Sequence, residues 1–275
     1  MMSWEYRIPT CVAAFDSIIM GGVPAGSVVL LTGDVGAGQR EFAYTSIARH
    51  ALARLGGNKR DWVITYKSDK IIVPKHTCYI TVSRSRDDIL REVYTSFDDE
   101  FYRAFVRELK FIDLSQQYFR DSIVPSQWTG GEINPFQKRG DLNESLVETL
   151  ETHGENSLVV IDSLTDLLSS SIDKKQVLYL LKGLQRMSKK WRGLIYLILT
   201  KGVVGEDVER AIADVVDGVL VFEWYKSSKY SMRSRYMYVT KFVGVLPHIK
   251  REKISRFNIE IGSMGLVVAD TERIG

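Results

Sequence analysis

Short apolar runs alternate with amphipathic or polar segments along the chain as far as about residue 215. The runs are rich in Val, Ile and Leu, which is typical of short strands buried on both faces of a parallel sheet. They predict strands at residues 28–31, 77–82, 110–114, 157–162 and 194–199. The segments between them predict a short helix in the lead-in 8–26, then helices at 41–55, from about 86, and at 100–109, 141–152, 173–191 and 206–215.

The pattern changes at residue 217, after which strands follow one another without helices between them. These closing strands are expected at 218–225, 236–242, 257–261 and 266–269. Strands that alternate with helices predict an α/β fold with a twisted, mostly parallel sheet flanked by helices. The closing strands then add a β meander over 217–275, antiparallel, at one edge of the sheet. The chain, 1–275, is expected to form a single domain.

Two segments interrupt this order. Residues 59–76 carry two short β-type runs in a polar and basic context, which predict an inserted hairpin. Residues 116–140 lack clear periodicity and contain two prolines and two adjacent glycines, which predict a long loop. A loop of that length is uncommon in a compact domain and is usually mobile or functional.

Composition narrows the class of protein only a little. The chain has 275 residues, of which 45% are apolar and 26% charged, as is ordinary for a globular protein, and its net charge of +3 does not argue for nucleic acid. Cys11 and Cys78 are too few and too far apart for a metal cluster or a secreted disulfide framework, so we expect reduced thiols in a cytoplasmic protein. The apolar run 194–199 is too short to cross a bilayer, so no membrane insertion is expected.

The chemistry of the chain centres on the turn after the first core strand. Gly33, Gly36 and Gly38 lie between strand 28–31 and the helix predicted from residue 41, in the layout of a phosphate-binding P-loop, Gly-x-x-x-x-Gly-Lys-Ser/Thr. Such glycines let successive backbone N–H groups point at an anion beside a helix N-terminus. The alternative is a glycine turn that only joins a strand to a helix.

Two chemical groups of the P-loop are missing. Gln39 replaces the lysine and offers a neutral amide where a charge would reach the β- and γ-phosphates. Arg40 replaces the hydroxyl residue that would bind Mg²⁺, and a guanidinium has no acceptor for a metal, although it could return a positive charge to the phosphates. Because a charge-assisted hydrogen bond is worth about 1.5–3 kcal/mol, the change at Gln39 alone lowers the expected affinity about tenfold or more.

A second element of a nucleotide site follows further along the chain. The run Ser157-Leu-Val-Val-Ile ends in Asp162, which is the Walker B pattern of a buried strand that delivers a carboxylate to the metal. Asp162 is therefore the one candidate metal ligand, and Mg²⁺ binding stays open. The candidate nucleotide-binding residues are Gly33, Asp34, Val35, Gly36, Ala37, Gly38, Gln39, Arg40 and Asp162.

With both Walker positions placed, the chain resembles the RecA superfamily, and within it the single-domain archaeal KaiC-like proteins. The resemblance covers nearly the whole length and is carried by FDSIIMGGVPAGSVVLLTGDVGAGQ, SLVVIDSLTDLL, GVLVFEWY, YVTKFVGVLPH and SRFNIEIGSMGLVV. It implies a RecA-like P-loop fold, ATP binding at subunit edges and often a hexameric ring.

The chain departs from the family where the family does its chemistry. The positions of two family glutamates, one of which polarises the attacking water, are Ser83 and Arg84 here, and neither can act as a carboxylate base. Of a Lys-x-Arg pair that reaches the neighbouring subunit's nucleotide, Lys241 is kept as a trans-subunit sensor, whereas Val243 replaces the arginine. No intact catalytic residue is therefore identified.

Residues 226–256 hold nine Lys and Arg against one acid, interleaved with tyrosines. Such a stretch suits nucleic acid, because phosphates need clustered cations and bases stack on aromatic rings. It equally suits protected edge strands, or an acidic neighbour in an oligomer. Trp62 and Trp128, if exposed, are candidate anchors for a protein partner.

The missing groups predict a pseudo-ATPase, a regulator or scaffold that binds ATP or ADP weakly and acts through protein partners. The resemblance to the KaiC-like proteins implies a homo-oligomer and a role in archaeal signal transduction or motility. Two alternatives stay open. One is a working ATPase that takes its cation and base from unusual positions, such as Arg40, Arg84 or a neighbour's Lys241. The other is a DNA-repair accessory protein that resembles recombinase paralogues and uses the basic closing strands.

Overall fold

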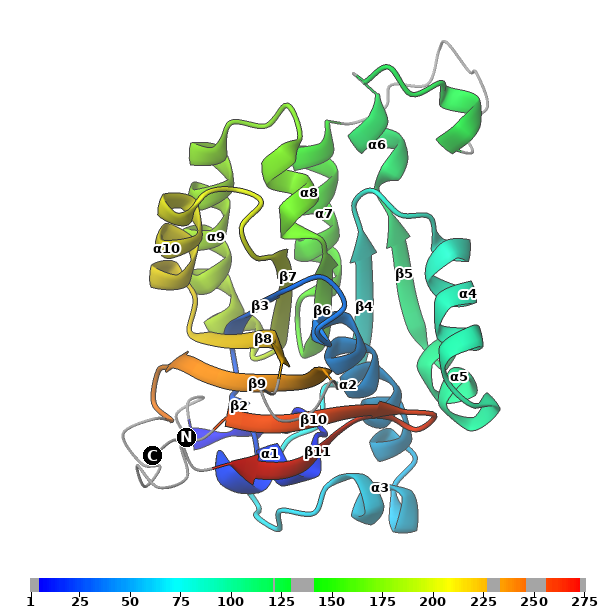
Figure 1. Cartoon of the computed structure of the whole chain (residues 1–275), viewed down its shortest axis with the longest axis vertical. Coiled ribbons are helices and arrows are strands. Elements are labelled where there is room, and N and C mark those ends of the chain that lie inside the picture. The colour runs from blue at the N-terminus through cyan, green and yellow to red at the C-terminus, as the bar shows by residue number, and fades with distance from the viewer. Residues whose placement is uncertain (1–4, 121, 130–140, 227–232, 246–255, 273–275) are drawn as a thin grey trace.

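The computed structural model describes residues 5–120, 122–129, 141–226, 233–245 and 256–272. A nine-stranded sheet with the order β11-β10-β9-β8-β3-β7-β6-β4-β5 runs through the molecule (Figure 1). Its strands are β3 (Ser27–Gly33), β4 (His76–Thr81), β5 (Leu109–Asp113), β6 (Ser157–Asp162), β7 (Leu194–Thr200), β8 (Gly218–Lys226), β9 (Arg233–Phe242), β10 (Arg256–Gly262) and β11 (Gly265–Glu272). A separate two-stranded sheet pairs β1 (Arg7–Ile8) with β2 (Val23–Pro24).

The strands from β8 to β5 in this order pair in parallel, and β8, β9, β10 and β11 pair antiparallel in sequence. Both the predicted parallel sheet and the predicted meander are therefore confirmed. The central parallel strands β3, β6 and β7 are nearly continuous apolar runs because helices cover both of their faces. The last two strands, β10 and β11, lie across the lower part of the molecule in Figure 1, close to α1 (Ala13–Ile18).

Two hydrophobic cores lie on the two faces of the sheet. Alternate residues of each strand enter opposite cores, so that in β3 Val29 and Leu31 face one and Val28 and Leu30 face the other. The first core is covered by α1, α2 (Gln39–Arg54), α4 (Arg86–Ser96) and α5 (Asp99–Val106), and the second by α7 (Leu142–His153), α8 (Leu164–Ser169), α9 (Lys174–Trp191) and α10 (Glu206–Val215).

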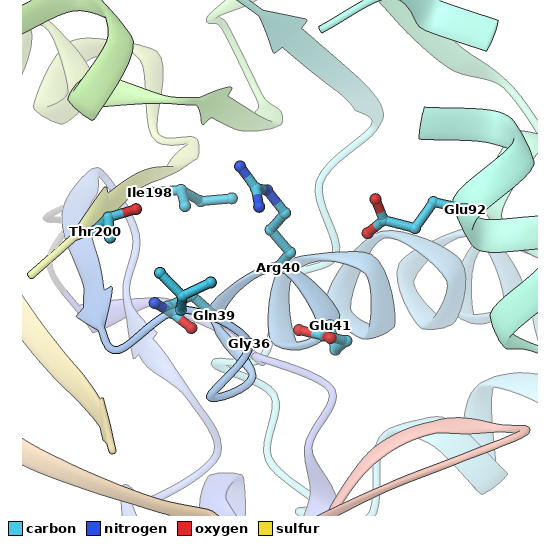
Figure 2. A pocket seen from close by; sticks show the side chains of 8 residues that line it. Gly36, Gln39, Arg40, Glu41, Glu92, Ile198 and Thr200 are labelled. Carbon is cyan, nitrogen blue, oxygen red and sulfur yellow. The ribbon is translucent and has the colours of Figure 1, made fainter. Parts of the chain in front are cut away.

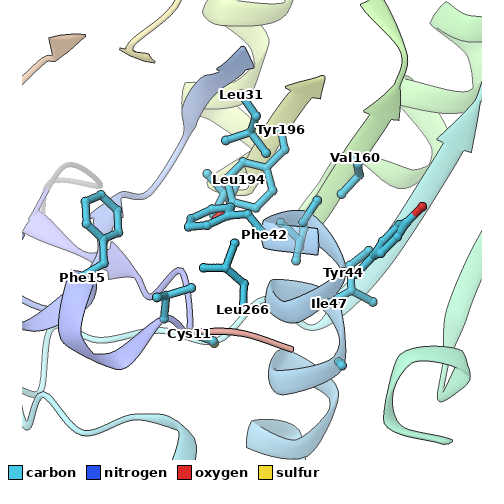
Figure 3. Packing of buried hydrophobic residues seen from close by; sticks show 14 of the residues in the cluster. Cys11, Phe15, Leu31, Phe42, Tyr44, Ile47, Val160, Leu194, Tyr196 and Leu266 are labelled. Carbon is cyan, nitrogen blue, oxygen red and sulfur yellow. The ribbon is translucent and has the colours of Figure 1, made fainter. Parts of the chain in front are cut away.

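Helix α2 is buried almost all round, whereas its sequence predicts only one inner face. Phe42 and Ile47 pack on the sheet as expected, beside Tyr196 and Leu194 (Figure 3). The opposite side of the helix is covered by neighbours far along the chain. For example, Thr45 Oγ1 accepts the N–H of Leu266 at 2.8 Å, at the start of β11. Leu55, expected on the inner face, is 50% exposed because the helix ends before it.

Two of the irregular segments differ from their predictions. The hairpin predicted at 59–76 is wrong: the segment begins within a helix, α3 (Gly57–Val63), Ile71 forms an isolated bridge to Arg7, and the last residue, His76, already belongs to β4. The long loop predicted at 116–140 contains α6 (Ser115–Phe119) and a 3-10 helix, η2 (Ser126–Thr129), while residues 121 and 130–140 lie outside the described part. None of the described helices is long and apolar enough to cross a membrane.

Candidate functional site

The glycine loop joins the end of β3 to the start of α2, as the sequence predicts. Gly33 packs against β8 so closely that a Cβ would lie 2.1 Å from the carbonyl oxygen of Phe222. Gly36 and Gly38 have φ angles of 72° and 125°, which side chains rarely allow. Close packing and backbone conformation therefore both require glycine here, and the loop has the backbone that a P-loop needs.

Side chains of the same chain hold the carbonyl groups of this loop. Gln39 Nε2 donates to the carbonyl of Asp34 at 3.0 Å, and Trp224 Nε1 donates to that of Val35 at 3.0 Å. Arg235 Nε donates to the carbonyl of Gly36 at 3.1 Å, and its guanidinium lies 4.2 Å from the centre of the Trp224 ring. The loop is thus fixed from β8 and β9 without any ligand.

Several backbone N–H groups of the loop have no acceptor in the described part of the chain. The Ala37 N–H is used within the loop, where it donates to Asp34. Within the described residues, no acceptor bonds the N–H groups of Gly36, Gly38, Gln39 and Arg40. Such a row of free N–H groups at a helix N-terminus favours negative charge. Gln39, whose side chain is turned back into the loop and only 6% exposed, adds no charge to it.

Arg40 pairs with the Walker B carboxylate. Its Nε lies 3.1 Å from both Oδ1 and Oδ2 of Asp162, a residue that is 1% exposed at the end of β6. The hydroxyl of Tyr79, on the neighbouring strand β4, donates to Asp162 Oδ2 at 2.7 Å. Figure 2 shows the Arg40 side chain extending away from the loop, while Gln39 points back toward it.

The electrostatics of this cluster fix its protonation. Burial lowers the pKa of Arg40, but the adjacent Asp162 carboxylate, together with Tyr79 and Tyr44, outweighs burial and raises the pKa above its usual value. Burial, assisted by Asp162, raises the pKa of Tyr79 well above its ordinary value. Arg40 therefore stays charged and Tyr79 stays protonated, and both bind the carboxylate as donors.

Glu92 lies opposite Arg40 in the lining of a cavity beside the glycine loop. The carboxylate of Glu92, on α4, accepts a hydrogen bond from the hydroxyl of Tyr44 at 3.2 Å and forms an ion pair with Arg84. Its carboxylate points toward Arg40 in Figure 2. Arg40, Glu41 and Glu92 line a cavity of about 230 Å³, together with Val35, Gly36, Gln39, Ile198 and Thr200. Glu92 is thus a carboxylate at the site that sequence reasoning did not identify.

The predicted catalytic and sensor positions have other surroundings. Ser83 lines a different cavity, of about 360 Å³, beyond the ends of β4 and β5. Arg84 forms an ion pair with Glu92. Neither Ser83 nor Arg84 carries a carboxylate that could act as a base. Lys241 Nζ donates to the backbone carbonyls of Ala213 and Asp214, at 3.0 and 2.6 Å, and caps the C-terminal end of α10 in its own chain. Its trans-subunit role stays a prediction.

The other candidate features are only partly described. Most of the basic stretch 226–256 lies outside the described residues, and Arg256 rests over the rings of Tyr225 and Tyr236. Trp62 and Trp128 are 50% and 79% exposed, which meets the condition set for partner anchors. Cys11 and Cys78 are buried and free. Among the described residues no cluster of His, Cys, Asp and Glu could hold a metal ion.

Four functional side chains escaped sequence reasoning: Tyr79, Glu92, Trp224 and Arg235. The only local signal is a tyrosine inside the apolar strand that contains Tyr79, because a buried tyrosine hydroxyl usually has a hydrogen-bond partner. The other three contact the site through pairings between distant segments.

The chain was compared with known proteins. No protein-family model and no curated protein matches the sequence. Among solved structures, the fold is similar to that of a KaiC-like protein from the hyperthermophilic archaeon Pyrococcus horikoshii OT3, with a TM-score of 0.64 and 18% sequence identity over 96% of this chain and 99% of that one. The predicted RecA-like fold of the KaiC type is therefore confirmed.

Proposed function

We propose that this chain is a KaiC-like P-loop protein that does not hydrolyse ATP and works as a regulator or scaffold. The observation that carries the proposal is the pair between Arg40 and Asp162. Arg40 occupies the position of the Mg²⁺-binding hydroxyl, and its guanidinium contacts the carboxylate that would hold the metal. The chain itself thus supplies the positive charge that the metal would bring.

This pair opposes metal binding in two ways. A divalent cation on Asp162 would lie beside the guanidinium, and like charges at such a distance repel strongly away from bulk water. To admit the ion, Arg40 would have to leave a partner that is almost fully buried. Breaking such a pair costs more than an exposed ion pair is worth.

Weak, metal-independent binding of a nucleotide agrees with the rest of the site. The free N–H groups of the loop favour phosphate, and Arg40 bonds Asp162 through Nε alone, so its two terminal nitrogens can still donate. The cavity of about 230 Å³ is smaller than the roughly 300–1,000 Å³ of most small-molecule sites. It suits the phosphates of ATP or ADP better than the whole nucleotide within one chain.

The wider role rests on the resemblance to archaeal KaiC-like proteins. It comprises a homo-oligomer, with a hexameric ring as the family's common form, and protein partners in signal transduction or motility. The exposed Trp62 and Trp128 are surfaces where such a partner could bind.

A working ATPase is the rival, and Glu92 is the observation in its favour. It is a carboxylate that lines the cavity opposite Arg40, where a base could stand. Against it, Tyr44 and Arg84 both bond this carboxylate, so its oxygens are already engaged by side chains of the same chain.

The test is a sensitive phosphate-release assay with ATP and Mg²⁺, paired with thermal unfolding in ADP with and without Mg²⁺. We expect hydrolysis at background and a small ADP stabilisation that Mg²⁺ does not change. Glu92→Gln should leave both results as they are. Turnover that rises with protein concentration and disappears in Glu92→Gln would establish the rival instead.

A further inference from the structure

A further cavity, of about 570 Å³ and distinct from the one that Ser83 lines, lies at the opposite end of the parallel strands from the glycine loop. It is lined where the chain enters β4 and β6 and where α9 ends, whereas the glycine loop follows the last residue of β3. The two sites are therefore separated by the length of the strands. The cavity falls within the roughly 300–1,000 Å³ typical of small-molecule sites.

Three cations converge on this cavity from three elements. Arg60 comes from α3, Lys75 precedes β4, and Arg192 caps the C-terminus of α9. No carboxylate lies among its lining residues, and within the described part of the chain none of the three cations forms an ion pair. Like charges held together without a counter-charge are unfavourable, and an anion would relieve them.

Arg192 lines this cavity from the C-terminal end of α9. It has φ 56° and ψ 24°, a left-handed conformation that few residues other than glycine adopt and that glycine usually supplies at a helix C-terminus. Its guanidinium lies 5.1 Å from the centre of the Tyr6 ring, which holds the cation without neutralising it.

Apart from Asn156, the remaining lining residues are apolar, and backbone hydrogen bonds fix the segment that carries most of them. This segment includes Ile71, Val73 and Pro74, and it is held at both ends. The Ile72 N–H donates to the backbone carbonyl of Arg7 at 2.9 Å, and the Lys75 N–H donates to the carbonyl of Asn156 at 2.8 Å. The cavity is thus formed without a ligand and offers both charge and apolar surface.

We infer that this cavity binds a small phosphorylated molecule that carries an apolar group. Two guanidinium groups and an ammonium group supply the positive charge and the N–H donors that a phosphate dianion binds, and the Ile, Val and Pro side chains suit an apolar body. The volume of the cavity is that of a small-molecule site, which favours a small ligand over a nucleic-acid strand. The assignment is independent of the nucleotide site.

The test is calorimetric titration of the full chain with phenyl phosphate, and with inorganic phosphate for comparison. The variant is Arg60→Gln, Lys75→Gln, Arg192→Gln, and the matched control removes three exposed cations elsewhere, Arg91→Gln, Lys182→Gln, Arg186→Gln. Both lose the same charge, and the glycine loop is intact in both, so their difference isolates this cavity.

We expect the cavity variant to bind phenyl phosphate at least about tenfold more weakly than the control, because one charge-assisted hydrogen bond is worth about that factor. Phenyl phosphate should also bind the wild-type chain more tightly than inorganic phosphate does. Equal binding by the two variants would overturn the site. Loss of binding to a single-stranded oligonucleotide, with phenyl phosphate unaffected, would overturn the small-molecule assignment.

The variants change exposed side chains, so we expect all of them to fold. Lys75→Gln alone provides a second, milder comparison, with an affinity loss smaller than that of the triple variant. If it binds phenyl phosphate as the wild type does while the triple variant fails to fold, the site is likewise overturned.

Discussion

At the carboxyl ends of the parallel strands the carboxylate of Asp162 is bonded only by side chains, whereas at the other end the carboxylate of Asp217 is bonded by a backbone N–H as well. Asp217 accepts the N–H of Val28 at 2.9 Å and bonds from Lys189 and Gln185 at 2.6 and 3.1 Å. Asp162 accepts from Arg40 and Tyr79. Both carboxylates are buried and neutralised by a cation, but only Asp217 anchors the start of the central strand.

Asp217 is thus a structural carboxylate, whereas Asp162, at the Walker B position, is paired with the side chain of Arg40. Removing Asp217 disturbs the backbone of the sheet, whereas the partners of Asp162 are side chains that substitution can change without moving a strand. The end of the sheet that carries the glycine loop is therefore the one whose chemistry can be altered, and three predictions follow this contrast.

The largest expected effect is on stability, from Asp217→Ala. The change leaves the buried Val28 N–H without its acceptor and Gln185 and Lys189 without their partner. We expect a loss of about 3 kcal/mol in the free energy of unfolding, measured in urea. Asp214→Ala, at an exposed residue nearby, should change it by less than about 0.5 kcal/mol. Equal effects would mean that Asp217 does not anchor β3.

The second prediction concerns the other carboxylate. Gln39→Lys with Arg40→Thr restores both P-loop groups and frees Asp162 for a metal. We expect ADP with Mg²⁺ to stabilise this variant by about 2.7 kcal/mol at a ligand concentration 100 times Kd, measured by thermal unfolding. ATP turnover should stay at background, because Ser83 and Arg84 still supply no carboxylate.

The matched control for this variant is Gln39→Lys with Arg40→Ala, which frees Asp162 but provides no hydroxyl. It should bind ADP with a weaker dependence on Mg²⁺. If the restored variant shows no dependence on Mg²⁺, Asp162 does not face the metal position. If it hydrolyses ATP at a substantial rate, the family's base has been assigned to the wrong residues.

The smallest expected effect is on the pH dependence of stability. It concerns His50 in α2, the helix that follows the glycine loop. His50 is fully buried, with one ring nitrogen 2.8 Å from the carbonyl of Pro9, and burial lowers its pKa to about 3. Below pH 6.5 the unfolded chain takes up a proton that the folded chain refuses, so stability falls as the pH falls toward 3. The contribution is a loss of about 2 kcal/mol between pH 8 and pH 5.

His50→Gln should remove this loss while keeping a donor toward Pro9, and His76→Gln, at an exposed residue, serves as its control. Burial raises the pKa of Asp16 to about 7, so Asp16 acts in the opposite sense over the same range. The quantity to measure is therefore the difference between variant and wild-type unfolding curves at each pH. If the stability of the variant and that of the wild type change with pH in the same way, His50 takes up a proton in the folded chain as readily as in the unfolded chain.

Local patterns carried much of the fold and the outline of the site. The apolar runs of β3, β4, β6 and β7 were predicted because a strand buried on both faces leaves a continuous signal. The glycine loop and Asp162 were predicted from spacing alone. The segment 59–76 was mistaken because Trp62-Val63-Ile64 has β-type composition, yet Val63 packs into the core from the end of a helix.

The sequence by itself determined where most strands lie along the chain, the glycines of the loop and the absence of a P-loop lysine, because each depends on residues close together in the chain. Only the tertiary structure decided what Arg40 does. It is 122 positions from Asp162, and the parallel pairing of β3, β7 and β6 brings the start of α2 next to the end of β6. The sequence shows that a guanidinium replaced a hydroxyl. That the guanidinium contacts the carboxylate, rather than a phosphate or solvent, depends on packing between distant segments.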